Sequence, residues 1–157
     1  MKTTLKKSVV WLLILIMAMS VIACEGSERN AVKNDVIKPF QTACNEQDVK
    51  GMLRCFNPTF SEPILTAMGI ADLLGVSGYL ERVVGQFDHF DKVDASVSDF
   101  LSSLTVKPSE YVFSDTKDTC NVSAVITYRS GSNQKEIAAI LHCVKKEGKW
   151  YLNRIGF

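Results

Sequence analysis

The sequence lacks the residue patterns that usually identify a metal site, a serine hydrolase or a nucleic-acid-binding protein. Its 157 residues include only two histidines, and no Cys-x-x-Cys pair or His–Cys cluster has the spacing of a zinc site. A Gly-x-Ser-x-Gly nucleophile motif is missing, as is the stripe of basic residues typical of nucleic-acid binding. We therefore expect no metal, no cofactor and no nucleic-acid partner.

Charge is missing from residues 8–23, a run of 16 residues that follows Lys2, Lys6 and Lys7. A basic start, an apolar stretch and small residues at its end are typical of a secretory signal peptide. A permanent membrane-spanning helix needs about 20 residues, so a slightly short membrane anchor is the less favoured alternative. Removal of residues 1–23 lowers the basic residues from 18 to 15, against 17 acidic residues, and leaves a nearly neutral chain.

The end of this run, Val21-Ile22-Ala23-Cys24, resembles the lipobox of bacterial lipoproteins. The resemblance implies that the Cys24 thiol receives a diacylglyceryl group and that cleavage follows just before it. Two acyl chains anchor a protein stably to a membrane, whereas one chain binds only reversibly. We expect a mature protein anchored to the extracytoplasmic face of the cell membrane, with a tether over residues 24–34 and a single domain over residues 35–157.

The remaining cysteines, Cys44, Cys55, Cys120 and Cys143, are even in number. In an exported domain this predicts two disulfides, with three connectivities allowed. Residues 119–143 have the pattern of a β-hairpin, two β-rich runs around a Ser- and Gly-rich turn. A turn between Gly131 and Ser132 gives one apolar face and sets Cys120 directly opposite Cys143 on it. Opposed residues in an antiparallel pair are close enough for a disulfide, so we predict a Cys120–Cys143 bond.

That pairing leaves Cys44 with Cys55. Asp35 is a candidate cap for a helix running to about Glu46, with Pro39 in its first turn. Asp48 is a candidate cap for a second short helix over residues 49–56, and the two would form a helical hairpin. The thiols would then lie on either side of the turn. The alternative is that one or both stay reduced and buried.

Helical patterns fill the first half of the chain and strand patterns the second. Ser61-Glu62-Pro63 is a candidate helix start with a stop at Gly75, and a further helix is expected within residues 94–103. Four strands separated by turn residues follow from about Lys107. This order predicts an α+β fold, with N-terminal helices packed on a C-terminal, antiparallel, four-stranded sheet.

The lipobox, the short helix beginning "DVKGML" at residue 48 and the terminal "VKKEGKWYLNRI" from residue 144 together resemble small Gram-positive lipoproteins of unknown function. Their domain is similar to the nuclear-transport-factor-2-like (cystatin-like) fold. The resemblance covers residues 33–157 and implies a bent sheet wrapped around helices in a cone. That superfamily includes enzymes, ligand-binding modules and interaction domains, so the fold does not give the function.

Two groups of residues are candidates for chemistry. Asp88, His89 and Asp91 could form a metal or acid–base cluster, but neighbours in sequence do not converge, and a solvated segment with Phe87 and Phe90 turned inward is favoured. His142 is predicted to face Asn121 on one side and Asn153 on the other. These three residues, Asn121, His142 and Asn153, would form a polar row on the sheet face away from the disulfide.

The polar row is interpreted as part of a binding site or interface, or else as a solvated row that stabilises strand pairing. No carboxylate is predicted beside His142, so a catalytic triad is not expected. The favoured function is a non-catalytic domain that binds a protein partner or a small apolar ligand, the latter suggested by the apolar residues 63–87. The alternatives are an enzyme with a cone-shaped pocket that uses His142 or Asp88 and His89, and a homodimer through the second sheet face, where Ile140, Val144, Tyr151 and Ile155 are expected.

Overall fold

The computed structural model describes residues 26–71 and 79–157, and the folded domain comprises Val32–Phe157. The predicted signal peptide, Cys24 and the helix stop at Gly75 lie outside the described residues. The domain has an α+β fold in which helices precede a mixed sheet of five strands.

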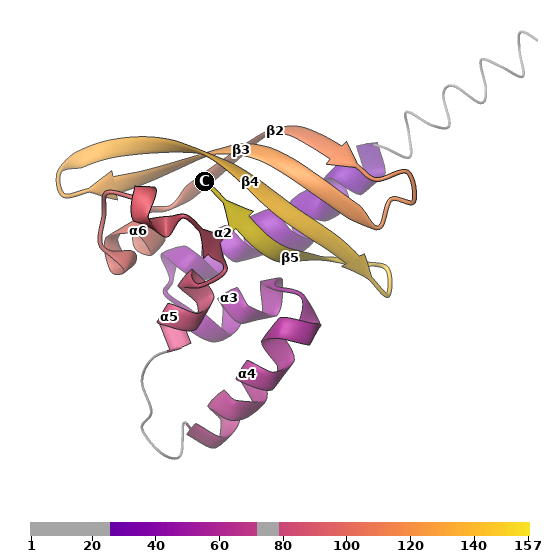
Figure 1. The fold of residues 1–157 in the computed structure, drawn as a ribbon, viewed down its shortest axis with the longest axis horizontal. Coiled ribbons are helices and arrows are strands. Elements are labelled where there is room, and N and C mark those ends of the chain that lie inside the picture. Colours follow the sequence, from indigo (N-terminus) through magenta and orange to yellow (C-terminus); the bar gives the residue numbers. More distant parts are fainter. Residues whose placement is uncertain (1–25, 72–78) are drawn as a thin grey trace, which may run out of the picture. The chain divides into compact units, whose positions relative to one another are not determined.

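The helices are η1 (Lys33–Ile37), α2 (Lys38–Asn45), α3 (Val49–Cys55), α4 (Pro58–Ala71), α5 (Tyr79–Val84) and α6 (Val97–Ser103), with a short 3-10 turn η2 (Phe90–Lys92) before α6. The strands are β1 (Phe87–Asp88), β2 (Thr105–Phe113), β3 (Thr119–Ser130), β4 (Asn133–Lys146) and β5 (Lys149–Gly156). Figure 1 shows η1 and α2 running across one face of the sheet.

The predicted start of the first helix at Asp35 is wrong. Residues 26–32 are already helical, so residues of the predicted tether belong to a helix, and Asp35 lies inside the π-helical segment η1. The π turn is closed by a bond from Lys38 N–H to the Lys33 carbonyl. Lys38, the residue that closes this turn, directly precedes Pro39. Proline has no N–H to donate and so interrupts the regular series of α-helical hydrogen bonds. The Asp35 carboxylate instead accepts a hydrogen bond from the Trp150 backbone N–H at 3.1 Å, which ties the helix to β5.

Two further helix starts show how capping decides a boundary. Helix α4 begins at Pro58 rather than at Ser61, because Asn57 Oδ1 accepts the Thr59 N–H and proline is well tolerated at the first helical position. Helix α6 begins where Ser96 Oγ accepts the Asp99 N–H, within the predicted range. The expected helix after Asp48 is present as α3, but the Asp48 side chain makes no capping hydrogen bond to it.

The sheet has the strand order β1-β5-β4-β3-β2. The four predicted antiparallel strands are all present, but the prediction of a four-stranded sheet is incomplete, because β1 adds a fifth strand parallel to β5. β1 contains only two residues, too few to show the alternation that marks a strand in a sequence.

The predicted β3–β4 register is confirmed along the whole hairpin, from Ser130 opposite Asn133 to Cys120 opposite Cys143. Gly131 lies in the turn with φ of 61°, a left-handed conformation that glycine adopts without strain. The predicted turn between β4 and β5 is also confirmed, at Glu147 and Gly148.

The core lies between the helices and the helix-facing side of the sheet. Aromatic rings fill much of it: Phe87 packs against Phe40, Phe90, Phe100 and Phe157, with ring centroids 5.9–6.1 Å apart. At the opposite edge of the sheet, the side chain of Gln41 on α2 accepts the Val106 backbone N–H at 2.8 Å. None of the described helices covers the other sheet face, which carries the polar residues described next.

Candidate functional site

A β-bulge in β5 organises the open face of the sheet. Cys143 pairs with Leu152 and Leu141 pairs with Ile155, so that two residues of β5, Asn153 and Arg154, stand opposite His142 alone. A bulge of this kind turns both extra side chains to the same side of the sheet. The prediction that His142 pairs with Asn153 is therefore wrong by one residue: its Cα partner is Arg154.

The same bulge corrects the predicted second sheet face. A shift of one residue moves every later side chain of a strand to the opposite face. Ile155, expected beside Ile140 on the open face, is fully buried in the core opposite Leu141. Ile140 remains on the open face and is 45% exposed.

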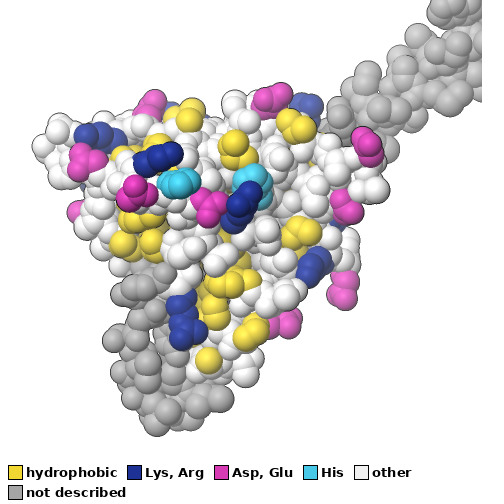
Figure 2. All heavy atoms as spheres, in the orientation of Figure 1, with side chains coloured by type: hydrophobic (Ala, Val, Ile, Leu, Met, Phe, Trp, Pro, Cys, Tyr) yellow, Lys and Arg dark blue, Asp and Glu magenta, His cyan; other side chains and the backbone are white. Residues whose placement is uncertain are grey.

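Next to the bulge is a shallow cavity of about 700 Å³, which we call the bulge pocket. The structure brings the predicted polar row together there, although not in the predicted register. The lining residues are Asn57, Thr119, Asn121, His142, Cys143, Val144, Asn153 and Arg154. On the face in view, Figure 2 shows histidine, basic and acidic side chains adjoining one another over the sheet.

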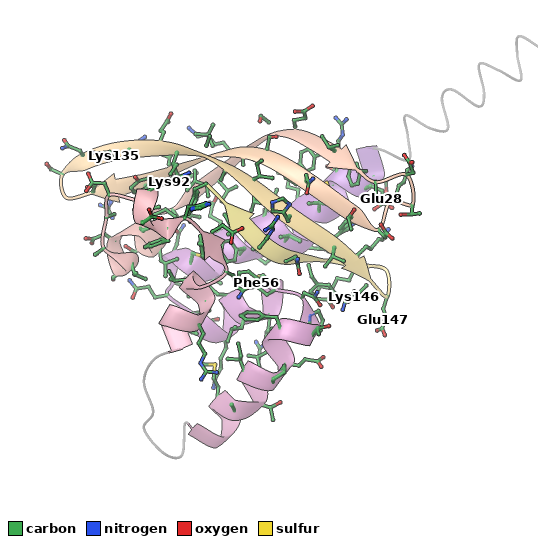
Figure 3. The ribbon with its side chains drawn as sticks, in the orientation of Figure 1. Glu28, Phe56, Lys92, Lys135, Lys146 and Glu147 are labelled. Atoms are coloured by element: carbon green, nitrogen blue, oxygen red, sulfur yellow. The ribbon has the colours of Figure 1, made fainter. Side chains whose placement is uncertain are left out.

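Hydrogen bonds hold side chains of the pocket from two neighbouring elements, β3 and the link between α3 and α4. His142 Nδ1 lies 2.8 Å from Asn121 Oδ1 on β3. Because this amide oxygen only accepts, Nδ1 carries the proton and Nε2 has a lone pair to offer. From the link between α3 and α4, Asn57 Nδ2 donates to Asn153 Oδ1 at 3.4 Å. That link also docks on the edge of β5, where Phe56 bridges to Leu152 (Figure 3).

The charges beside the pocket come from two further strands. Arg154 Nη1 donates to Asp88 Oδ2 at 3.1 Å, and the two side chains are 54% and 45% exposed. Burial lowers the pKa of His142 below its ordinary value, the positive charge of Arg154 lowers it further, and Asp88 opposes both effects. The imidazole is therefore neutral at neutral pH. The pairing of β1 with β5 places Asp88 and His142, two separate candidates in the sequence, in one electrostatic neighbourhood.

The other candidate residues do not converge with Asp88. His89 is exposed in a left-handed turn with φ of 62°, and Asp91 is exposed on η2. Phe87 is buried and Phe90 packs against it, as the favoured interpretation of this segment expects. Within the described ranges, no group of three histidine, cysteine or acidic side chains could hold a metal ion.

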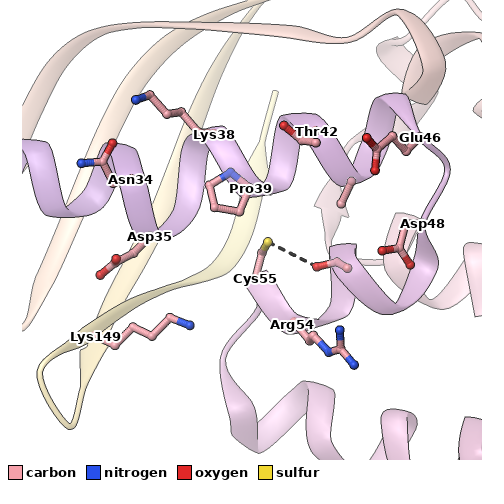
Figure 4. A pocket seen from close by; sticks show the side chains of 12 residues that line it. Asn34, Asp35, Lys38, Pro39, Thr42, Glu46, Asp48, Arg54, Cys55 and Lys149 are labelled. Atoms are coloured by element: carbon pink, nitrogen blue, oxygen red, sulfur yellow. Dashed lines mark hydrogen bonds between the residues drawn. The ribbon is translucent and has the colours of Figure 1, made fainter.

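A second cavity, of about 590 Å³, lies where α2, α3 and the start of β5 meet (Figure 4). Figure 4 shows Cys55 directed toward α2, with its thiol donating to the Gly51 carbonyl at 3.3 Å, and Lys149 reaching in from β5. Both acidic and basic side chains line the cavity. The lining residues are Asn34, Asp35, Lys38, Pro39, Thr42, Ala43, Glu46, Asp48, Gly51, Arg54, Cys55 and Lys149.

The four described cysteines are buried thiols, and the two disulfides stay predictions. Burial raises the pKa of Cys55 to about 11, against the lowering effect of Lys149 and with a smaller raising effect of Asp48. Burial also raises the pKa of Cys44 and of Cys143. The second cause of each raised pKa is the thiol of the predicted disulfide partner, Cys55 for Cys44 and Cys120 for Cys143.

Sequence reasoning missed Arg154 and Asn57 as members of the site. Arg154 could have been found, since core residues follow one another at a spacing of two from Trp150 to Leu152 and then at three to Ile155. Such a change of spacing is typical of a bulge. Asn57 directly precedes a proline, a typical helix start, but its place beside β5 depends on tertiary contacts.

The chain matches no protein-family model, no curated protein and no solved structure. Across residues 26–71 and 79–157, no helix is both long and apolar enough to span a membrane.

Proposed function

We propose that the chain is a lipoprotein anchored by Cys24 to the extracytoplasmic face of the membrane, and that its domain is a non-catalytic binding module. The binding site is the bulge pocket, together with the open sheet face around it. The observation that carries this proposal is the grouping of His142, Asn153 and Arg154 at one bulge on an uncovered face. Bulges are over-represented next to functional sites, where they redirect side chains.

Apolar residues beside the pocket support contact with a partner. The two large hydrophobic residues that are most exposed in the described chain, Val112 and Ile140, both lie on this face. Val112 stands opposite Asn121, and Ile140 lies two residues before His142 on β4. A polar centre with apolar neighbours can bury surface while its hydrogen bonds fix the orientation of the bound molecule.

Catalysis is less well supported than binding. The Asp88 carboxylate is bound by Arg154, whereas the His142 imidazole is bound by Asn121. Cys143 lines the pocket, but its thiol lies on the opposite, core-facing side of the sheet, where it is buried with a raised pKa and is therefore protonated at neutral pH. A polar lining also favours a polar ligand over the small apolar ligand that residues 63–87 suggested.

Two features support a proposed similarity to nuclear-transport-factor-2-like domains: most helices precede the four long strands in the chain, and helices pack on one sheet face. We include in the proposal the bent, cone-like sheet of that fold and the lipid anchor. In the anchored protein, the domain would present its open face to molecules outside the membrane.

Site-specific photo-crosslinking in a Gram-positive host tests this function. A photoreactive residue replaces Ile140 on the open face, and as a matched control it replaces Glu147, which is exposed at the β4–β5 turn (Figure 3). We expect a discrete adduct in the membrane fraction from position 140 only, and its loss on addition of His142→Ala. Equal labelling from both positions, or an adduct that survives His142→Ala, would contradict the proposed site. Cys24→Ser should release the chain from the membrane fraction.

A further inference from the structure

We propose that the bulge pocket binds a carboxylate group, held between the guanidinium of Arg154 and the imidazole of His142. This inference rests on the proposed function and names the chemistry of the ligand. Four features of the pocket support it: a cation that is only partly engaged, neighbouring amide groups, a fixed imidazole and a limited total charge.

The first feature is the Arg154 side chain. A guanidinium has five N–H groups in a planar fork that matches the two oxygens of a carboxylate. Asp88 takes the contact with Nη1 and leaves the side chain 54% exposed. The other N–H groups of the guanidinium remain available to a ligand, which competes with Asp88 for the cation.

The second feature is the amide pair at the other end of the pocket. Asn57 Nδ2 donates to Asn153 Oδ1 over a long distance of 3.4 Å, and each amide nitrogen has two N–H groups. Uncharged donors of this kind can bind a carboxylate oxygen without a second cation. They come from the α3–α4 link and from the bulge itself, so the site depends on both elements.

The third feature is the orientation of His142. Its bond to Asn121 fixes the ring and presents Nε2 as an acceptor. Its charged neighbours are Arg154 on β5 and Asp88 on β1, whereas Asn121 on β3 and Asn57 on the α3–α4 link are neutral. A bound carboxylate would offset the charge of Arg154 and favour a proton on Nε2, which then donates to the ligand. Binding and proton uptake are therefore coupled.

The fourth feature is the limited positive charge, which favours a carboxylate over a phosphate. Arg154 is the single cation among the eight lining residues, and Asp88 partly offsets it. Lys146, at the end of β4, donates to Thr59 at 2.7 Å. A phosphate group carries about two negative charges at neutral pH, and Arg clusters are its usual receptors.

The two histidines of the chain provide the test. The full chain, purified from membranes in mild detergent, is titrated by NMR in sodium acetate and in sodium chloride of equal ionic strength. We expect acetate to raise the pKa of His142 in a saturable manner and to cause no saturable change in the NMR signals of His89, which lies in an exposed turn outside the pocket. Equal behaviour of His142 in the two salts, or equal shifts of both histidines, would overturn the inference.

Variants identify the groups responsible. Arg154→Gln should abolish the acetate effect, and Arg129→Gln, which removes another exposed arginine of the sheet, should retain it. If Arg154→Gln does not fold, Asp88→Asn gives an independent test. Loss of an exposed ion pair that competes with the ligand should tighten acetate binding by roughly 2- to 5-fold. Weaker acetate binding by Asp88→Asn would contradict the assigned role of Arg154.

A carboxylate can belong to a small acid or to the end of a peptide chain. Short peptides with a free C-terminus, matched peptides with an amidated C-terminus and succinate distinguish these sources. Tighter binding of the free peptide than of acetate assigns a chain terminus, and tighter binding of succinate assigns a small acid. Binding of the amidated peptide as tightly as both the free peptide and succinate overturns the inference. If the carboxylate tests fail but the adduct at position 140 persists, the ligand chemistry is wrong and the binding module stands. If the carboxylate tests succeed but no adduct forms at position 140, the carboxylate site stands and only the proposal of a macromolecular partner is wrong.

Discussion

Arg154 stands directly opposite His142 in the β4–β5 ladder, and the extra residue Asn153 lies beside it on the same face. Two polar side chains of one strand thus meet a single histidine of the next. This relationship exists because Leu152 and Ile155 both face the core, which leaves two residues rather than one between them. The open face therefore carries a cation, an amide and an imidazole within one bulge.

The first prediction concerns the electrostatics of this bulge. Since Arg154 lowers the pKa of His142 and Asp88 raises it, Arg154→Gln should raise that pKa and Asp88→Asn should lower it. Both shifts should be small, because both charges are solvent-exposed. NMR titration of the two variants measures the shifts, with His89 in the same spectra as a reference. Shifts of the same sign in both variants would show that the charges do not act as described.

The second prediction concerns the contact between α2 and α3. A Cβ atom at Gly51 would lie 2.5 Å from Asp48 Oδ2 and 3.1 Å from Ala43 Cβ. The exposed Asp48 carboxylate can turn away from the added atom, whereas the buried Ala43 Cβ must shift, so Gly51→Ala should be less stable than the matched helix-interior variant by about 1 kcal/mol. Gly69→Ala is the matched control, because Gly69 is in helix α4 with no atom within 4 Å of its Cβ position. That variant should gain about 0.5–1 kcal/mol. Urea unfolding of both variants measures the difference, and equal effects would contradict the packing described here.

The third prediction concerns the disulfides. Peptide mapping of the exported chain without reductant should recover Cys120 linked to Cys143, and Cys44 linked to Cys55. The first bond would contribute about 3 kcal/mol to stability on the chain-entropy model. Recovery of Cys44 or Cys55 linked to a β-strand cysteine would contradict both the hairpin and the helix pairing.

The fourth prediction concerns alkaline pH in the reduced chain. Burial raises the pKa of Cys44, Cys55 and Cys143 above the ordinary value of 9.0, so above pH 9 the unfolded chain loses protons that the folded chain retains. Stability is then full below pH 9 and is lost as pH rises, by about 1.4 kcal/mol per pH unit for each thiol. For Cys55 the loss ends near its folded pKa of about 11. Urea unfolding at pH 8 and pH 10, with and without reductant, should show a steeper loss in the reduced chain. Equal slopes would contradict the prediction.

The sequence predicts the β-hairpins better than the helix boundaries. The register of the β3–β4 hairpin can be read from residues that are close in sequence. The alternation of apolar residues, the turn glycine Gly131 and the positions of Cys120 and Cys143 all indicate the same register. The start of the first helix fails because the helical backbone runs through Asp35 and accommodates Pro39 with a π turn. The position of this π turn depends on packing against β5, and residues close in sequence carry no signal for that contact.

The site is predictable only in part for the same reason. Asn121, His142 and Asn153 lie on three neighbouring strands. Because polar and apolar residues alternate along each strand, the sequence can assign all three to one face. Asp88 reaches the site through a two-residue parallel strand, and its partner Arg154 lies 66 positions away in the chain. Contacts at such separation arise only when the whole sheet has formed.

The central claim is that the bulge pocket retains a ligand. Native mass spectrometry of the full chain, released from its own membranes in mild detergent, tests it most directly. We predict that the wild-type chain carries an added mass, that Arg129→Gln keeps it and that Arg154→Gln loses it. A bare wild-type chain, or the same added mass on Arg154→Gln, would contradict the account.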